Sequence, residues 1–529
     1  MKLIFDVSDK PKAGQLVVFA LQQMLAILAA TIAVPLIIGN GLTPASAMFG
    51  AGVGTIVYIF FTKRKSPVFL GSSFAFLGSM AAAFAGGVSM QLGMLGLIVG
   101  AFLAGLVYVV IAIVVKFVGV GWLNKLMPAV VIGPTVAIIG LSLAGNAIGD
   151  LVKGDVTKQV TEYAVSTDSG TPEIIETVSN VPVGSSYVAL ICGLITLAVV
   201  MLCSTYGKKT LRLIPFIIGI LAGYAAAAIF TVIGNICDID ALKIVDFSVF
   251  SSYMLTDGSV SLKTFVSLPD FAFVSGLKGL KEFDFTYFAT IFVAYVPVAL
   301  VVFAEHVADH KNLSSIIDHD LLEEPGLTRT LLGDGVGSIA GALFGGCPNT
   351  TYGESVACVA ITGNASVVTI FAAAIGCMLF SFITPLVAFV DSIPACVMGG
   401  VCIALYGFIA VSGLKMIQDA NLDDNRNLFV VSVILIAGIG GLTLTFGDIT
   451  LTEVAAALIL AFLQTLCSQR KKATQPRNNY NKIAEANSVH TLLHTKKCEF
   501  INHYERKSKN GKRKYHQSPA CKAQNNAYA

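Results

Sequence analysis

The stretch FDFTYFATIFVAYVPVALVVFAEH, residues 283–306, decides the fold class of this chain. Its apolar run is long enough to cross a bilayer, whose hydrocarbon core requires about 20 apolar residues per helix. Glu305 stands at the end of this run, where an ionised side chain is costly. A second carboxylate, Glu354, follows in the broken apolar segment CPNTTYGES, residues 347–355. Carboxylates in such a setting predict a substrate or proton site inside a membrane.

The composition places the whole chain in the same class. Its 529 residues are 55% hydrophobic and 13% charged, with a mean hydropathy of +0.77. A compact soluble domain does not carry so much apolar surface, so we expect an all-α polytopic membrane protein. The charged opening MKLIFDVSDKPKAGQ shows no cleavage-site pattern behind a short apolar core. No removable signal peptide is therefore expected.

Apolar runs of spanning length predict fourteen transmembrane segments, if two short and interrupted runs are counted. Clusters of Lys and Arg follow every second span and fall on one side, whereas the loops 150–185 and 237–284 lie opposite and are more acidic than basic. Because short cytoplasmic loops carry an excess of Lys and Arg, both termini are expected in the cytoplasm and the protein in the cell membrane. The predicted spans centre near residues 27, 52, 77, 102, 137, 195, 223, 297, 338, 357, 377, 404, 437 and 459.

Short sequences recur at a spacing of about half the membrane body. GAGVGTI at 50–56 agrees with GDGVGSI at 333–339 at five of seven positions, and PAVVIG at 128–133 returns as PACVMG at 394–399. If each half has seven spans, an odd number, the second half must enter the membrane inverted. Inverted repeats are typical of secondary transporters, whose sites lie at mid-membrane. The small residues of the glycine-rich runs are expected to let helices approach closely.

Each half also has one interrupted segment after its glycine-rich span: FLGSSFAF at 69–76 and CPNTTYGE at 347–354. Pro, Asn and β-branched Thr disfavour helix in the second of these, so we expect a short extended stretch leading into a half helix in predicted spans 3 and 10. Unpaired backbone at membrane depth is tolerated only in protein or beside a polar cavity. Its free N–H groups could donate to a ligand's carbonyl oxygens, with Glu354 as an acceptor beside them.

Two carboxylates, backbone donors and the ring of Phe74 or Tyr352 suit a small planar molecule with alternating N–H and C=O edges, such as a nucleobase. An inorganic anion fits poorly, because the carboxylates would repel it and the spans hold no Lys or Arg to replace them. A channel would not need this arrangement. A membrane hydrolase would need a nucleophile beside a base, and the His residues of the membrane body gather at one helix end, 306–319. No nucleic-acid partner is expected.

Proton coupling is predicted from the same helix. Glu305 and Asp309 are four residues apart and lie on one helical face, where two negative charges disfavour each other. One of the two is expected to hold a proton near neutral pH, and its movement with the base would give symport. His306 points about 100° away, so a structural role is favoured for it. Asp334 either supports the site from behind or caps a broken helix.

The remaining features do not predict a cofactor or a metal. The eleven cysteines are scattered, form no C-x-x-C pair, and are interpreted as small core residues. The tail 468–529 carries fourteen Lys and Arg against three Glu. We expect it to be disordered and cytoplasmic, either as a solvated extension or in contact with anionic lipid.

Three motifs, GSSFAF at 71–76, AEHVADH at 304–310 and PNTTYGE at 348–354, resemble the nucleobase–ascorbate transporter family, most of all its bacterial uracil permeases. The resemblance extends from about residue 15 to 467. It implies fourteen spans in two inverted seven-span repeats, and a homodimer formed through the gate domain. It also implies these divisions: a cytoplasmic N-terminus (1–14), a core domain that holds the base (15–120 and 285–389), a gate domain that closes on it (121–236 and 390–467), and an extracytoplasmic loop (237–284).

The resemblance also implies roles for individual residues. Glu305 and Glu354 would hydrogen-bond the base, the backbone of Phe74 and Gly353 would contact it, and Ala30 would line the pocket. Tyr352 is the second aromatic candidate.

This sequence departs from the family pattern after Glu354, where Ser355, Ala357, Thr362 and Gly363 keep it only in part, and at two positions where members often have His. Gln23 stands where many members have His, which removes a titratable group from the proton-coupling set. Asp309 stands where the uracil branch usually has His, as in purine transporters, whereas Glu354 is typical of the uracil branch. Uracil is therefore the first expectation and xanthine the second. The residues leave open whether a proton or sodium is the coupled ion.

Overall fold

The computed structural model describes residues 3–463, apart from 120–127, 167–172, 209–210, 213, 255–258, 419, 447–448, 452–453 and 462. Residues 1–465 form one compact unit, and the tail falls in a second unit that begins at Leu466. The expectations for the tail 468–529 therefore lie outside the described residues.

The described residues are mainly helical. Eight of their helices are long and apolar enough to cross a membrane. The other predicted spans coincide with shorter or more polar helices, so the number fourteen stays a prediction. The eight are α1 (Ala13–Ile38), α2 (Pro44–Phe61), α4 (Met90–Val118), α6 with α7 (Ala129–Ser142 and Ala144–Leu151), α8 (Ser186–Tyr206), α10 (Pro215–Cys237), α13 (Phe285–Ile317) and α18 (Ala395–Ile417).

Shorter elements connect and complete these helices. The α-helices are α3 (Leu77–Ala83), α11 (Ser248–Met254), α12 (Ala272–Gly276), α14 (Leu327–Gly345), α15 (Gly353–Thr362), α16 (Val367–Phe380), α17 (Thr384–Asp391) and α19 (Asn425–Ile439). The short 3₁₀-helices are η1 (Phe74–Phe76), η2 (Ala85–Gly87), η3 (Asp240–Leu242), η5 (Leu262–Thr264) and η6 (Leu277–Lys281), and η7 (Leu322–Gly326) is a single π-helical turn. The strands are β1 (Leu70–Ser72), β2 (Thr157–Ser166), β3 (Glu173–Pro182), β4 (Asn349–Thr351), β5 (Leu444–Phe446) and β6 (Ile449–Leu451).

The two interrupted segments meet each other as short extended stretches. β1 and β4 pair antiparallel, with Leu70 opposite Thr351 and Ser72 opposite Asn349. β1 leads into η1 and α3, and β4 leads into α15, so both stretches open onto short helices as the residue types predicted. The pairing joins residues that are 277 to 281 positions apart in the chain, and their backbone N–H and C=O groups find hydrogen-bond partners away from water.

Two further hairpins were not predicted. β2 pairs with β3 within the loop expected at 150–185, and β5 pairs with β6 near residue 447. The first contains VTEYAVS and EIIETV, in which β-branched residues recur, a pattern that favours strands. Both hairpins lie outside the long helices, so the described residues are predominantly helical, as expected.

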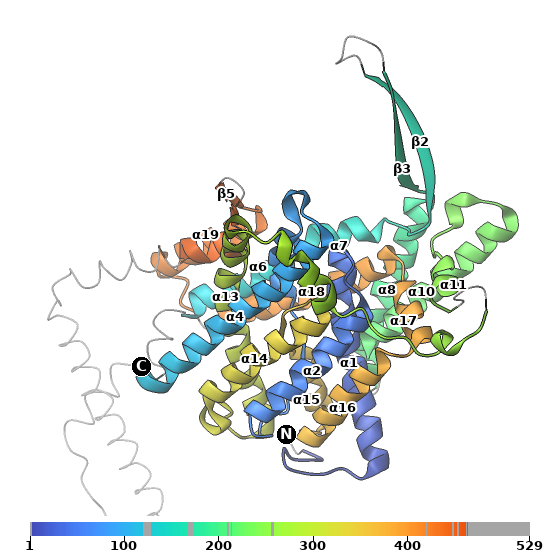
Figure 1. Ribbon diagram of the computed structural model, residues 1–529. Coiled ribbons are helices and arrows are strands. Elements are labelled where there is room, and N and C mark those ends of the chain that lie inside the picture. The colour runs from blue at the N-terminus through green and yellow to red at the C-terminus, as the bar shows by residue number, and fades with distance from the viewer. Residues whose placement is uncertain are drawn as a thin grey trace, which may run out of the picture. The chain divides into compact units, whose positions relative to one another are not determined.

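Glycines bring α2 against α14, and α2 also packs against α16 (Figure 1). A Cβ at Gly54 would lie 2.8 Å from the carbonyl oxygen of Gly337, which is too close for any side chain. A Cβ at Gly337 would meet the carbonyl oxygen of Gly54 at 2.7 Å. The glycine-rich runs that recur in the sequence thus face each other, which confirms the expectation of close helix packing.

A loop carboxylate holds the start of α18. Asp155 Oδ1 accepts a hydrogen bond from the backbone N–H of Ala395 at 3.1 Å, and the next N–H, of Cys396, donates to the carbonyl oxygen of Lys153 at 3.1 Å. Although the residue as a whole is exposed, local desolvation of its carboxyl group raises the pKa of Asp155 to about 6, because it disfavours the charged form. The hydrogen bond from Ala395 opposes this effect in part, while the nearby carboxylates of Asp150 and Asp246 add to it.

We predict that Asp155→Asn raises the stability of the protein at neutral pH. The pKa of this carboxyl group is higher in the folded state than in the unfolded state. Its protonated form therefore contributes to the free energy of unfolding below pH 3.8, and this contribution is lost as the pH rises through about 6. Asn keeps an oxygen for the Ala395 N–H and has no charge to bury. Thermal unfolding in detergent should show the melting temperature of the variant rising relative to that of the wild type as the pH increases from about 4 to about 7.5, by a modest amount because solvent screens the charge of the exposed Asp155.

The exposed carboxylate of Asp270 offers the matched control, Asp270→Asn. A stability difference between Asp155→Asn and the wild type that does not change with pH would contradict the assignment.

Candidate substrate site

A cavity of about 390 Å³ lies between helices that are far apart in the sequence. One wall comes from α13 and α15 and is acidic. Its residues are Glu305, Ala308, Asp309, Gly353, Glu354, Ala357, Cys358 and Ile361. Both carboxylates that the sequence singled out, and the proposed coupling residue Asp309, therefore meet at one cavity.

Local structure explains how these acids come together. Glu305 and Asp309 share a face of α13 because they are separated by one helical turn. Asp309 Oδ2 accepts a hydrogen bond from Thr351 Oγ1 at 2.8 Å, which ties α13 to β4. α15 begins at Gly353, so Glu354 lies in its first turn, where backbone N–H groups are free and the helix dipole is positive. The same wall therefore presents both hydrogen-bond acceptors and backbone donors.

The crossing of β1 and β4 holds the start of α15 in place. Tyr352 donates from its hydroxyl to the carbonyl oxygen of Ser72 at 2.8 Å, and its backbone N–H donates to the carbonyl oxygen of Phe69 at 3.2 Å. The N–H of Ser73 donates to the carbonyl oxygen of Pro348 at 2.9 Å. Phe74 and Gly353, the two residues expected to contact the base through their backbone, directly follow this crossing.

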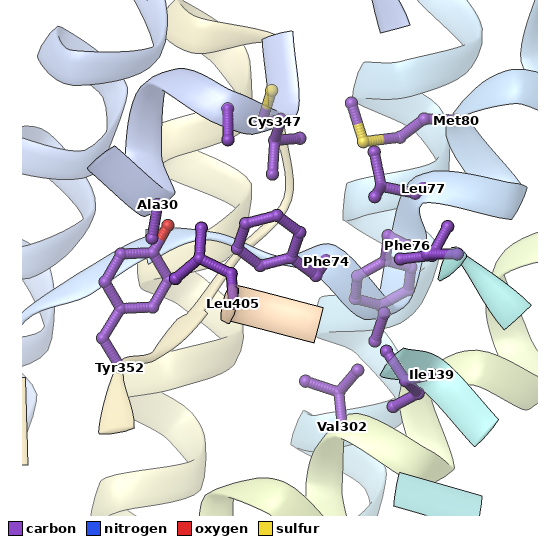
Figure 2. Close-up of a cluster of buried hydrophobic side chains, with 14 of the residues drawn as sticks. Ala30, Phe74, Phe76, Leu77, Met80, Ile139, Val302, Cys347, Tyr352 and Leu405 are labelled. Atoms are coloured by element: carbon purple, nitrogen blue, oxygen red, sulfur yellow. The ribbon is translucent and has the colours of Figure 1, made fainter. Parts of the chain in front are cut away.

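Three of the predicted site residues lie in a buried hydrophobic cluster and not among the residues that line the cavity (Figure 2). The close-up shows Ala30 beside the ring of Tyr352, and Leu405 between Tyr352 and Phe74. Phe74 meets Tyr406 edge to face, with ring centroids 5.8 Å apart. The expected ring partner for a base thus stands in a second group of residues, apart from the carboxylates.

Gln23 is also buried away from the cavity lining. Its Nε2 donates to Ser355 Oγ at 2.5 Å, and the same oxygen accepts the backbone N–H of Phe69 at 3.1 Å. The amide therefore links α1 to α15 next to the crossing. Gln23 therefore contacts Ser355, a residue that helps to position the site, and does not line the cavity itself.

Behind the acidic wall, α13 is held by polar contacts that the sequence only hinted at. His306 Nδ1 lies 2.7 Å from Asp334 Oδ2 in the interior of α14, and His306 Nε2 lies 3.0 Å from Thr330 Oγ1. Asp334 is fully buried, so it supports α13 from behind and does not cap a helix. His310 donates from Nδ1 to the carbonyl oxygen of His306 at 2.7 Å, and its Nε2 lies 2.6 Å from the hydroxyl oxygen of Tyr58.

Sequence reasoning missed the second wall of the cavity. It comes from α1, α6, α8, α10 and α18 and includes Ser204, Arg212, Phe216, Phe408, Ser412 and Met416. The rings of Phe216 and Phe408 meet edge to face, with centroids 6.0 Å apart. No spacing pattern connects these residues, because they sit on helices that only the tertiary fold brings together.

Comparison with known families decides the class of the chain. The xanthine–uracil permease model, described as "Permease family", matches residues 14–446. The chain belongs to this permease family. The uracil permease of Bacillus caldolyticus is 36% identical over 470 residues, covering 88% of this chain and 94% of the relative. The uracil permeases of Bacillus subtilis (strain 168) and Escherichia coli (strain K12) are 34% and 33% identical, covering 90% and 86% of this chain and 97% and 91% of the relatives.

Solved structures support the fold of this permease. The transmembrane domain of the cyanobacterial bicarbonate transporter BicA aligns with a TM-score of 0.55 at 12% identity, covering 87% of this chain and all of that domain. The murine anion transporter Slc26a9, in its inward-facing state, aligns with a TM-score of 0.56 at 12% identity, covering 89% of this chain and 70% of the other. At this identity the likeness shows a shared transporter fold only. The permease is a multi-pass membrane transport protein and not an enzyme.

We predict that Tyr352→Phe weakens the crossing without altering its packing. The substitution removes one buried hydrogen bond and leaves the Ser72 carbonyl unpaired, which costs about 1 to 3 kcal/mol. The melting temperature of the purified permease should fall, and the half-saturation concentration for its substrate should rise because Glu354 follows Tyr352 by two positions.

Tyr224→Phe is the control. Its hydroxyl bonds to Ser392 Oγ, and Tyr224 does not line the cavity. Equal effects of both variants on substrate affinity would argue against a link between the crossing and the site.

Proposed function

We propose that this permease imports a nucleobase, uracil in the first place, across the cell membrane by proton symport. The observation that carries the proposal is the acidic wall, where Glu305, Asp309 and Glu354 share one cavity with the first turn of α15. Its relatives named uracil permeases, identical at 33–36% of positions, support uracil over other bases. No metal or cofactor is part of the proposal.

The chemistry of the wall fits the edges of a pyrimidine-dione. Ring N–H groups would donate to Glu305 and Glu354, which are acceptors when ionised. Ring carbonyl oxygens would accept from the free N–H groups at the start of α15, next to Phe74 and Gly353. Ala30 and Tyr352 would shape the pocket from the buried cluster behind the crossing.

The proposed architecture is fourteen spans in two inverted repeats of seven. The core domain (15–120 and 285–389) would hold the base, and the gate domain (121–236 and 390–467) would close on it. The antiparallel pairing of β1 with β4 supports this reading, since inverted halves bring equivalent segments together in opposite directions. We further propose that both termini, 1–14 and the tail, lie in the cytoplasm, that residues 237–284 lie outside, and that the permease forms homodimers.

Coupling would use the closely spaced acids of α13. Glu305 and Asp309 repel each other when both are charged, so a proton taken up there would favour binding of the base, and its release would follow the base. Gln23 contributes an amide where a titratable side chain would otherwise stand. A neutral base that moves with one proton gains about 2.3 kcal/mol per 100 mV, enough for roughly 40-fold accumulation.

Xanthine is the second candidate substrate, favoured by the carboxylate of Asp309 one turn after Glu305. Anion exchange, suggested by the names of the structural neighbours, is disfavoured because three carboxylates and only one cation, Arg212, are among the described residues that line the cavity. Chloride or bicarbonate transport would revive it.

Competition in transporter-deficient cells tests the substrate. We predict saturable uptake of labelled uracil, inhibited by unlabelled uracil at lower concentrations than by xanthine, hypoxanthine, thymine or cytosine. Glu354→Gln should reduce uptake at least tenfold. One of the two carboxylate oxygens becomes an NH₂ group, which cannot accept a hydrogen bond from a ring N–H of the base. Glu323→Gln, on an exposed carboxylate, is the control. If xanthine inhibits the uptake of labelled uracil at lower concentrations than unlabelled uracil does, xanthine is the preferred substrate.

Collapse of the proton gradient tests the coupling. We predict that an uncoupler abolishes accumulation of uracil while leaving exchange of internal for external uracil intact. Asp309→Asn should shift the pH dependence of uptake, because the pair on α13 then contains one ionisable group. Accumulation that survives the uncoupler but requires sodium would replace the proton by sodium in the proposal.

A further inference from the structure

The part of the cavity lining that comes from α8 contains one hydroxyl that is buried and unpaired. Ser204 Oγ makes no hydrogen bond to any of the described residues, although it is shielded from solvent. Among the residues that line the cavity, it alone has such a buried, unpaired side-chain atom in the described part of the chain. A buried hydroxyl without a partner destabilises a protein, so its presence beside a cavity indicates a partner that arrives with a ligand.

The surroundings of Ser204 complement the acidic wall. Arg212, in the connection between α8 and α10, also lines the cavity. Its Nη2 donates to the carbonyl oxygen of Thr205 at 3.0 Å. The rings of Phe216 and Phe408 lie on the same wall, and Phe408 is 56% exposed. This wall therefore offers hydrogen-bond donors and aromatic faces, whereas the wall of α13 and α15 offers carboxylate acceptors.

A planar heterocycle with both N–H and C=O edges needs both kinds of wall. We infer that Ser204 is a substrate-contacting residue, whose hydroxyl donates to a ring carbonyl oxygen of the base as the base leaves the carboxylates. The inference rests on the proposed function and deepens it, because it assigns α8 a direct part in recognition.

The position of Ser204 places this contact on the release side. It lies in the last turn of α8, which ends at Tyr206, and the following connection carries Lys208 and Arg212. Basic connections of this kind mark the face expected in the cytoplasm. Removal of the hydroxyl should therefore affect the base more strongly from inside than from outside.

If the hydroxyl of Ser204 contacts the substrate, its removal should weaken substrate binding without lowering the stability of the permease. Ser204→Ala removes no hydrogen bond within the described structure, so the melting temperature of the ligand-free permease should stay equal or rise. The half-saturation concentration for uracil on the cytoplasmic side should rise about threefold to tenfold, as for the loss of one neutral hydrogen bond. A residue that only holds the fold together would lower the melting temperature instead.

The experiment uses the full-length permease in membrane vesicles of both orientations and in detergent. Thr205→Val is the matched control, since its hydroxyl donates to the Met201 carbonyl oxygen at 2.7 Å on an exposed surface and Thr205 does not line the cavity. Ser204→Thr retains the hydroxyl and should restore the cytoplasmic half-saturation concentration towards the wild-type value.

Each outcome decides the matter. A rise confined to the cytoplasmic side, present in Ser204→Ala and absent in Thr205→Val, supports the inference. Unchanged uracil kinetics in Ser204→Ala, an equal rise from both sides, or a lowered melting temperature overturns it while the proposed function stands. A wild-type permease that moves neither uracil nor xanthine overturns the proposed function and this inference together.

Discussion

Backbone groups buried away from water need hydrogen-bond partners within the protein, and the pairing of the buried strands β1 and β4 supplies them for two interrupted apolar segments at once. The pairing needs glycine at Gly71, because a Cβ there would meet the ring of Tyr352. It also needs glycine where α2 and α14 are closest, because a Cβ at Gly54 or Gly341 would meet the amide nitrogen of Asn349. Once the crossing forms, the start of α15 is held beside α13, and the carboxylates share one cavity as a result.

The acids are then supported from behind by buried polar contacts. His306 with Asp334, and His310 with Tyr58, tie one face of α13 to α14 and α2 while the other face carries Glu305. Low dielectric surroundings strengthen such hydrogen bonds and make their loss expensive. A helix held by buried contacts on one face and acidic on the other suits the proposed binding of a neutral base and a proton.

Much of this site could be predicted from residue types. A carboxylate in an apolar run, a Pro-Asn-Thr-Thr break and a glycine before Glu354 each have a local physical meaning, and the structure brings these residues to one cavity. The aromatic partner could not be predicted in the same way. Phe74 and Tyr352 stand near the acids in sequence motifs, yet their rings pack in the buried cluster, while Phe216 and Phe408 reach the cavity from α10 and α18.

The amino-acid sequence alone determined the membrane class, the interrupted segments and the two carboxylates, because hydropathy, helix breaking and the cost of a buried charge act over a few residues. Only the tertiary structure decided which helices face the acids. Ser204, Arg212 and Phe408 acquire a meaning from the packing of α8, α10 and α18 around α13, and such packing depends on contacts between residues hundreds of positions apart. No local pattern carries that information, since each of these side chains would look equally ordinary on a lipid-facing or a cavity-facing helix.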